Sequence, residues 1–502
     1  MLDLGSNSAR VVIWSLAEDN SYRITDKAKE MVRLSEGMTE DYRLKPDAMS
    51  RTLEALKVFS NIIKANNVSK TYAVATAALR RAENAEVFLS RIKGEAGLDV
   101  EVISGLKEAT YVYYGVLNTL PVRDCILIDT GGASTELVLV RNRKMVEATS
   151  IPIGAIVLSE QFLKPQDSEM YLKLPPSPDL LKRMYDHVED SLRSLKWLKD
   201  VKCPVVGLGG SIRSLGKVCQ KQSVYPLRML HGYDIPTSEV VSAIDMIELL
   251  PVKKRPEIPG FDKKRADTIV GGLAPLRKVL DITSCQNVVI SESGLREGVF
   301  YRHLLDENPV IDDILEHSIE NILKLYRQNI NHCRYVRRLS ESMFNQLRDV
   351  HKVDEVYKKP LLCAAMLHDI GLSVDYENHE QHGFYLMLAI RLYGLTHKEL
   401  VLSAFLVGMH RLEEFKVDWR KYDGIISERD YESIKKLSII LKIAENLDRS
   451  EDGFIESVKC LVNDDSIQIM LKSRHDTNLQ AFAVSKNRKA FAKMFDRKLE
   501  VM

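Results

Sequence analysis

Two short turns, each led by an aspartate and rich in glycine and hydroxyl side chains, constrain this chain most. The first spans residues 3–8 (Asp-Leu-Gly-Ser-Asn-Ser) and the second spans residues 129–135 (Asp-Thr-Gly-Gly-Ala-Ser-Thr). Strand-like apolar runs follow at 11–14 and 136–140, so each turn is predicted to be the tip of a β-hairpin. Backbone N–H groups at such a tip can hold an anion, and a carboxylate beside them can hold a metal. Two such turns predict a polyphosphorylated ligand gripped between duplicated lobes.

The order of predicted elements divides the chain into four parts. At 502 residues the chain is too long for one hydrophobic core. Strands and helices alternate over roughly the first 300 residues, which indicates a layered α/β architecture. Long helices of 3.6-residue period follow, and two short strand-like runs precede a basic helix at the end. We predict an α/β fold with lobes at 1–124 and 125–301, an all-α domain at 302–454 and a small α+β domain at 455–502.

Composition excludes several classes of partner. The chain is 45% hydrophobic and 28% charged, and its formal net charge is +1. No overall field attracts it to nucleic acid or to a membrane, so we expect neither a specific nucleic acid nor a membrane as partner. No apolar stretch reaches the roughly 18 residues that cross a bilayer. The seven cysteines are odd in number and form no CxxC pair, so we expect reduced thiols and a cytoplasmic location.

Several polar groups could converge on a phosphate. Backbone donors are expected at Gly5, Ser6, Asn7, Gly131, Gly132, Ala133 and Ser134, and the flanking acids are Asp3, Asp129 and Glu136. Arg80 follows a predicted strand, and Glu108 falls in the first turn of a predicted helix. Phosphoryl transfer requires donors and cations for the oxygens and one carboxylate for the attacking group. Each feature alone is also common in proteins without such a site, since Asp-x-Gly turns are frequent hairpin tips and acids favour helix N-termini.

Seven motifs in a fixed order carry a family resemblance. They are DLGSNS at 3–8, TAALR at 76–80, ISGLKEA at 103–109, DTGGASTE at 129–136, GLGGS at 207–211, RADTIVGG at 265–272 and SESGLREG at 291–298. The chain resembles the exopolyphosphatase/guanosine pentaphosphate phosphatases of the actin–hexokinase–Hsp70 superfamily. The resemblance implies two actin-like, ribonuclease H-like lobes around a cleft. It also implies a homodimer that hydrolyses the terminal phosphate of inorganic polyphosphate or of guanosine pentaphosphate.

The resemblance also assigns roles to residues. Glu108 matches the catalytic glutamate that positions or deprotonates water, and Arg80 matches a phosphate-binding arginine. The acids implied to hold Mg²⁺ are Asp3, Asp129 and Glu136. The residues implied to contact phosphate are Gly5, Ser6, Asn7, Ser8, Gly131, Gly132, Ala133 and Ser134, with Gly209, Gly210 and Ser211 for a further phosphate or a nucleoside.

Two departures from the family pattern concern the turns. Ala133 stands where a third glycine is usual, and its Cβ disfavours a positive φ, so we expect a local change there. Only two residues precede Asp3 where the family has a full strand, so either the given start is late or the first strand is shortened.

A second candidate site lies in the helical region. Its ligand-type residues are His332, His368, Asp369, His379, His382, His410 and Asp448. Several are in register with apolar helix faces, as a metal site in a bundle core requires, although a single inward histidine is more often an ordinary core residue. The order resembles the HD phosphohydrolase superfamily and implies one or two divalent ions (Mn, Fe or Mg). The alternative is a degenerate wall of a polyphosphate channel.

Three basic clusters, at 253–255, 263–265 and 334–338, could extend the groove for a long polyanion, or they could be solvated surface. The function favoured is a Mg²⁺-dependent phosphohydrolase. The rivals are an ATP-dependent small-molecule kinase of the same superfamily and a polyphosphate- or alarmone-binding protein without hydrolytic activity.

Overall fold

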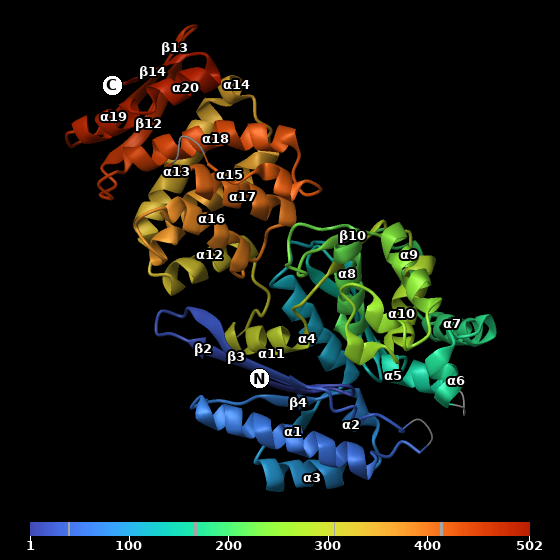
Figure 1. The fold of residues 1–502 in the computed structure, drawn as a ribbon. Coiled ribbons are helices and arrows are strands. Elements are labelled where there is room, and N and C mark those ends of the chain that lie inside the picture. Colours follow the sequence, from blue (N-terminus) through green and yellow to red (C-terminus); the bar gives the residue numbers. More distant parts are fainter. Residues whose placement is uncertain (39–40, 165–167, 306, 412–414) are drawn as a thin grey trace. The chain divides into compact units, whose positions relative to one another are not determined.

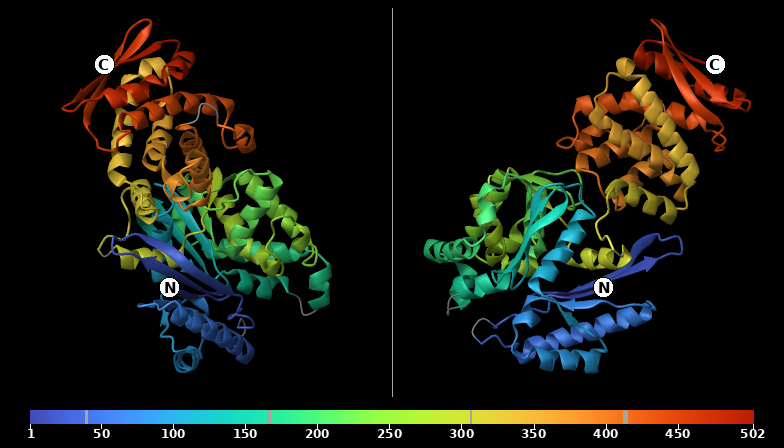
Figure 2. Two further views of the ribbon diagram at one scale, coloured as in Figure 1. Left: turned by 60° about the vertical axis from the view of Figure 1, so that its left-hand side comes forward. Right: turned by 180° about the vertical axis from the view of Figure 1, so that it is seen from behind.

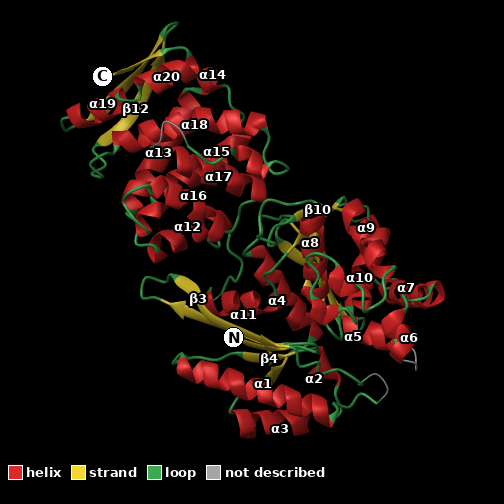
Figure 3. Cartoon of the chain, viewed as in Figure 1, coloured by secondary structure: helices red, strands yellow, loops and turns green. Residues whose placement is uncertain are grey.

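The computed structural model describes residues 1–38, 41–164, 168–305, 307–411 and 415–502 (Figure 1). The chain divides into two compact units. The α/β unit comprises residues 1–15 and 23–312, and the helical unit comprises residues 16–22 and 313–502. In Figure 3 the α/β unit mixes strands with helices, whereas strands of the helical unit gather at its C-terminal end. No helix in the described ranges is both long and apolar enough to cross a membrane.

The first lobe of the α/β unit is built on a five-stranded sheet. Its strands are β1 (Leu2–Leu4), β2 (Ala9–Leu16), β3 (Tyr22–Glu30), β4 (Ala73–Ala75) and β5 (Glu101–Val102), in the order β3-β2-β1-β4-β5. β1 pairs antiparallel with β2 and parallel with β4. Helices α1 (Pro46–Ala65) and α3 (Ala85–Ala96) run side by side in all views (Figures 1 and 2), and their buried faces join the core beside this sheet. The first strand is short, with only three residues.

The second lobe repeats this topology. Its strands are β6 (Cys125–Thr130), β7 (Thr135–Arg141), β8 (Lys144–Ile151), β9 (Val205–Leu208), β10 (Asp234–Pro236) and β11 (Asn287–Ile290). The order is β10-β11-β9-β6-β7-β8, so β8-β7-β6-β9-β11 corresponds strand for strand to β3-β2-β1-β4-β5. β6 pairs antiparallel with β7 and parallel with β9, as β1 does with β2 and β4. The duplication that the two turns suggested is therefore present in the sheet order.

Further helices complete this unit. They are α2 (Ala77–Arg81), α4 (Gly105–Leu117), α5 (Ala155–Leu158), α6 (Ser168–Lys173), α7 (Pro178–Leu192), α8 (Gly209–Gln222), α9 (Thr237–Glu248), α10 (Ile269–Ile282) and α11 (Leu295–Leu304). Helices α4 and α11 pack closely on each other and share one apolar core with strands of the second sheet. Val112 and Val116 of α4, for example, lie in one cluster with Leu127 and Val138. The helix before the predicted lobe boundary at 124 thus covers the sheet that follows it.

Glycines allow α4 and α11 to approach each other. A Cβ added to Gly115 of α4 would lie 2.1 Å from the carbonyl oxygen of Gly294, and one added to Gly298 of α11 would lie 1.7 Å from that of Tyr111. Both distances are far below contact distance, so only glycine fits there. The predicted boundary at 301 falls inside α11. Because this helix packs on α4, the α/β unit continues to residue 312.

The helical unit places a bundle of helices before its C-terminal sheet. They are α12 (Ile314–Leu325), α13 (Ile330–Gln346), α14 (Arg348–His351), α15 (Lys358–Leu367), α16 (His379–Ala389), α17 (His397–Met409) and α18 (Glu428–Leu447). The C-terminal elements are β12 (Ile455–Val462), β13 (Ser466–Ser473), α19 (Asn478–Ser485), α20 (Arg488–Phe495) and β14 (Lys498–Val501), with strand order β12-β13-β14. The tip of the β2–β3 hairpin belongs to this unit, because the amide of Asn321 on α12 bonds both backbone groups of Tyr22.

The close contact of α4 and α11 can be tested with two glycine substitutions. We expect Gly115→Ala to destabilise the protein by about 1–3 kcal/mol, because the new methyl group has no space. Gly94→Ala is the matched control: Gly94 also lies within a helix but has no atom within 4 Å of an added Cβ, so its replacement should be neutral or stabilising by up to about 1 kcal/mol. Denaturant midpoints of the two variants measure the difference, and equal midpoints would contradict the packing described.

Candidate active site

The two predicted turns have the same local geometry. The N–H of Gly5 donates to the carbonyl of Ser8 at 3.1 Å, and that of Gly131 donates to the carbonyl of Ser134 at 2.9 Å. The turns touch, since a Cβ on Gly132 would lie 2.9 Å from the Cβ of Ser6. The predicted pair of glycine turns is therefore brought together at one place in the α/β unit.

A cavity lies at this junction and collects most of the predicted residues. The residues predicted from the sequence that line this cavity are Asp3, Gly5, Ser6, Asn7, Ser8, Glu108, Asp129, Gly131, Gly132, Ser134, Glu136, Gly209 and Gly210. Arg80, Ala133 and Ser211 are not among the described lining residues. Arg80 is nevertheless held beside Glu108, as described below.

Ala133 and Ser211 are both buried: Ala133 lies beside Gly154, and Ser211 lies beside Gly272 of α10. Ala133 is only 3% exposed and does not adopt a positive φ, so its Cβ does not strain the turn as the sequence led us to expect. Ser211 points to α10, where a Cβ on Gly272 would lie 2.1 Å from its hydroxyl oxygen. The structure thus gives both residues packing positions outside the cavity lining.

Glu108 is held at the cavity by Arg80. Ser104 caps α4 by accepting the N–H of Lys107 at 3.1 Å, which places Glu108 in the first helical turn. Arg80 Nη1 donates to Glu108 Oε2 at 3.0 Å and to the carbonyl of Ile103 at 2.9 Å. Burial raises the pKa of Glu108 well above its ordinary value, and the charge of Glu136 adds to this, while Arg80 opposes it. Glu108 is therefore a stronger base than an exposed glutamate and is held at the edge of the cavity by Arg80.

The three other acids predicted from the sequence, Asp3, Asp129 and Glu136, also line the cavity. The hydroxyls of Ser134 and Ser150 each donate to Glu136 Oε1 at 2.7 Å. Burial, and then the charge of Asp129, raises the pKa of Glu136 to about 7 despite these bonds. Burial likewise raises the pKa values of Asp3 and Asp129. These acids form an all-oxygen donor set, which fits a hard divalent cation such as Mg²⁺.

Four arginines also line the cavity and were missed or misjudged from the sequence. They are Arg10, Arg213, Arg265 and Arg296. Among the described residues, the buried Nε of Arg10 has no hydrogen-bond partner, and burial followed by the charges of Arg213 and Arg296 lowers its pKa to about 10. Such a group of cations suits the oxygens of a phosphate ligand.

The duplicated register gives a sequence signal for Arg10. Asp3 pairs with Arg10 across β1 and β2, and Asp129 pairs with Glu136 across β6 and β7. Arg10 therefore has the same spacing from its aspartate as Glu136. The contact of Arg265 appears only in the structure, where a Cβ on Gly210 would lie 1.9 Å from Arg265 Nη2. We found no comparable signal for Arg213.

The basic clusters differ from the predicted surface track. Arg255 is fully buried and donates to the carbonyls of Leu250 and Ala266 at 3.1 and 2.7 Å. In the third cluster, Arg334 and Arg337 form ion pairs on the surface of the helical unit. The glutamates that accept these two pairs are Glu320 and Glu316. These arginines therefore serve structural contacts.

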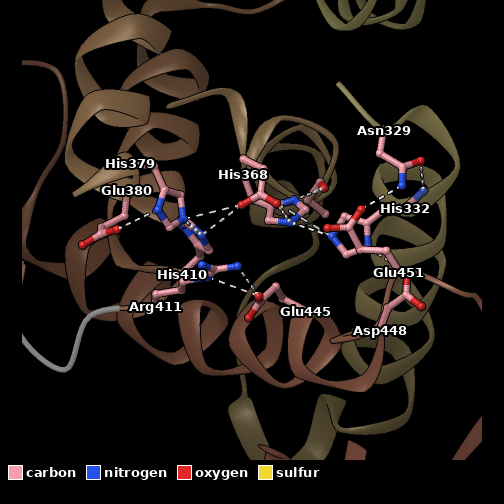
Figure 4. A network of polar contacts seen from close by, with 12 residues as sticks. Asn329, His332, His368, His379, Glu380, His410, Arg411, Glu445, Asp448 and Glu451 are labelled. Atoms are coloured by element: carbon pink, nitrogen blue, oxygen red, sulfur yellow. Dashed lines mark hydrogen bonds and ion pairs between the residues drawn. The ribbon is translucent and has the colours of Figure 1, made fainter. Parts of the chain in front are cut away.

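Four predicted histidines of the helical unit gather at one place (Figure 4), and Asp369 belongs to the same groups of potential ligands. They are His332, His368, His379 and His410. His332 and His368 face each other with 3.2 Å between their Nε2 atoms, and His379 and His410 do so at 3.3 Å. Asp369 Oδ2 lies 3.9 and 3.4 Å from the Nε2 atoms of His332 and His368. Its Oδ1 lies 3.6 Å from the Nε2 atoms of both His379 and His410. One carboxylate therefore faces two histidine pairs, one with each oxygen.

Hydrogen bonds fix how these rings present their nitrogens. The Nδ1 atoms of His368, His379 and His410 donate to backbone carbonyls at 2.9, 2.9 and 2.6 Å. Nδ1 therefore carries the proton, and each Nε2 directs a lone pair inward, as in metal-binding histidines. At 3.2–3.3 Å, two facing Nε2 atoms are held together either by a shared proton or by a cation between them.

Two predicted ligands have other positions. Asp448 Oδ2 lies 2.7 Å from His332 Nδ1, so this carboxylate is behind the ring and is absent from both groups of potential ligands. His382 lies three residues after His379 on α16 and is also outside both groups. Of the seven predicted residues, five are potential ligands, and Asp448 orients one of them, His332. The structure does not bring His382 to the site.

Comparisons with known proteins agree with this architecture. Residues 13–307 match the Ppx/GppA phosphatase family and residues 314–487 match domain III of that family. The chain is 28% identical over 482 residues to the guanosine-5′-triphosphate,3′-diphosphate pyrophosphatase of Aeromonas hydrophila, covering 94% of this chain and 92% of that protein. The chain belongs to the Ppx/GppA phosphatase family and is a phosphohydrolase.

Solved structures show the same fold. The crystal structure of the Aquifex aeolicus family member is 33% identical, with a TM-score of 0.51, and covers 61% of this chain and 97% of its own. The crystal structure of an exopolyphosphatase from Cytophaga hutchinsonii is 24% identical, with a TM-score of 0.55, and the match covers 62% of this chain and 98% of that one. At this level of identity the similarity supports the fold alone.

The raised pKa of Glu136 predicts a pH-dependent response to Mg²⁺. The pKa of Glu136 rises from its ordinary value of 4.5 to about 7 in the folded state. Between these pH values the folded protein keeps a proton on Glu136 that the unfolded chain releases. The cation-free protein therefore loses stability as the pH rises from 4.5 to about 7. A divalent cation at this site would bind the ionised carboxylates, so adding Mg²⁺ should raise the melting temperature more at about pH 8 than at about pH 6. Glu136→Gln should reduce this difference. Equal responses at the two pH values would contradict the assignment.

Proposed function

We propose that this phosphohydrolase removes terminal orthophosphate from inorganic polyphosphate and from the 5′ end of guanosine pentaphosphate. One observation carries the proposal: Glu108, held by Arg80, opens onto the same cavity as the N–H groups of both glycine turns. The similarity to the Aeromonas hydrophila protein supports a guanosine polyphosphate as one substrate. Both substrates offer the same kind of end, a chain of phosphoanhydrides.

Different residues of the cavity bind phosphate, activate water and hold the metal ion. The turn N–H groups and the four arginines bind phosphate oxygens and hold the terminal phosphorus at a fixed place. Glu108 orients a water molecule toward that phosphorus and takes its proton, and its raised pKa makes the ionised carboxylate a stronger base for this step. Mg²⁺, held by Asp3, Asp129 and Glu136, would neutralise charge on the phosphate oxygens when bound.

The finer architecture and assembly are also proposals. The repeated strand order supports two actin-like lobes, and the histidine cluster supports an HD-type helical domain. We further propose a homodimer, which analytical ultracentrifugation would test. The seven cysteines are free, six of them buried, which supports a reducing cytoplasm as the location.

Replacing Glu108 tests the hydrolytic mechanism. We expect Glu108→Gln to reduce phosphate release by at least about 100-fold while polyphosphate binding changes little, because the amide keeps the shape but cannot take a proton. Phosphate release and filter binding on polyphosphate and guanosine pentaphosphate, with and without Mg²⁺, measure the two effects. Retained turnover in the variant would refute the role of Glu108.

The same assay separates the rival functions. A kinase would need an acceptor hydroxyl and would release little phosphate without one. A binding protein would hold polyphosphate tightly without turnover. Release of phosphate to water by the unaltered protein excludes both.

We also propose that the helical unit binds one or two divalent transition ions, which its two histidine pairs and Asp369 would hold. The donor set of four imidazoles and one carboxylate fits Mn or Fe better than Mg. His332 and His368 would hold one ion, and His379 and His410 the other. The alternative role, a wall of a polyphosphate channel, does not require the facing Nε2 pairs.

Metal analysis tests this centre directly. Purified protein should contain up to two transition ions per chain, and His368→Ala should lose metal and lower the melting temperature relative to the loaded protein. His382→Ala is the matched control, since His382 belongs to the same helix as His379 but lies outside both ligand groups. Equal metal content in the two variants, or none in the unaltered protein after loading with Mn²⁺ or Fe²⁺, would contradict the proposal.

A further inference from the structure

One ion pair joins the two lobes of the α/β unit. Arg33 follows β3 of the first lobe, and Asp267 precedes α10 of the second. Arg33 Nη1 lies 2.8 Å from Asp267 Oδ2, and Nη2 lies 3.3 Å from Oδ1. This two-point contact has the geometry of a directional arginine–carboxylate pair. The side chains are 31% and 20% exposed, so water screens the pair only in part.

The backbone of Arg33 is attached to the first glycine turn. Its N–H donates to the carbonyl of Asn7 at 3.0 Å, and the N–H of Ser35 donates to that of Ser6 at 3.1 Å. Arg33 has a φ of +46°, which is uncommon for a residue with a side chain and persists only where surrounding contacts hold it. A shift of Arg33 would therefore move the turn that lines the cavity.

Asp267 is attached just as firmly on the second lobe. Its carbonyl accepts the hydroxyl of Tyr171, and the preceding carbonyl of Ala266 accepts Arg255 Nη1 at 2.7 Å. Two residues before Asp267, Arg265 lines the cavity and lies against Gly210. The ion pair thus links the first turn to a cavity arginine through short, hydrogen-bonded segments on both sides.

We propose that Arg33 and Asp267 are an interlobe latch that sets the distance between the first glycine turn and Arg265. Neither side chain is among the described residues lining the cavity, so both act as positioning residues. The latch favours the arrangement in which donors from both lobes reach one phosphate chain. Its effect on turnover rests on the proposed phosphohydrolase function, whereas its effect on lobe packing does not.

A double-mutant cycle tests the latch. Arg33→Ala and Asp267→Ala should each lower kcat/KM for phosphate release from polyphosphate by about fivefold or more. The double alanine variant should be no worse than either single variant, because the second change removes nothing further. The exchanged pair, Arg33→Asp with Asp267→Arg, should recover part of the activity that either charge reversal alone removes. Glu36→Gln is the matched control, because Glu36 contacts Arg33 at 3.7 Å from within the first lobe.

The pattern of losses distinguishes a latch from direct phosphate binding and from unfolding. A loss in Arg33→Ala with none in Asp267→Ala would mean that Arg33 binds phosphate itself, and it would overturn the latch. Losses that multiply in the double alanine variant would also overturn it, as would a loss in Glu36→Gln equal to that in Arg33→Ala. Melting temperatures of all variants identify simple unfolding. If the unaltered protein releases no phosphate, the proposed function fails; if it does and the single variants match it, the latch alone fails.

Discussion

The enclosure of like charges in one cavity is the constraint on which the α/β unit depends. Asp3, Asp129, Glu136 and Glu108 are withdrawn from water near one another, and burial raises the pKa of each. An arrangement of this kind is costly in an empty protein and becomes favourable with cations and an anionic ligand present. The hydrogen bonds of Arg80, Ser134 and Ser150 hold Glu108 and Glu136 in place for that occupied state.

Duplication accounts for how one cavity acquired both signs of charge. The two lobes repeat the same strand order and the same turn, but the position opposite the aspartate is Arg10 in the first and Glu136 in the second. A symmetric pair of identical turns would present either cations or acids twice. The divergence at this one position lets one lobe provide a cation for phosphate oxygens and the other an acid for a metal.

The sequence predicts the class of fold and most of the cavity, since glycine turns and alternating strands act locally. It predicts less where packing between distant segments decides. Ser211 looks like a turn donor, but the close approach of α10 at Gly272 buries it. Arg255 looks like part of a basic surface, but it is buried and donates hydrogen bonds to the carbonyls of Leu250 and Ala266. His382 has the residue type of a ligand, but three residues along a helix from His379 it misses the shared centre.

The sharing of α4 between the lobes limits how this architecture could have been assembled. The helix comes from the first half of the chain, but its apolar residues fill the core of the second sheet. A fragment ending near residue 124 would expose that face, and the complementary fragment would lack its cover. The halves are therefore not exchangeable modules, and recombination at the boundary between them would yield two insoluble pieces in place of two working ones.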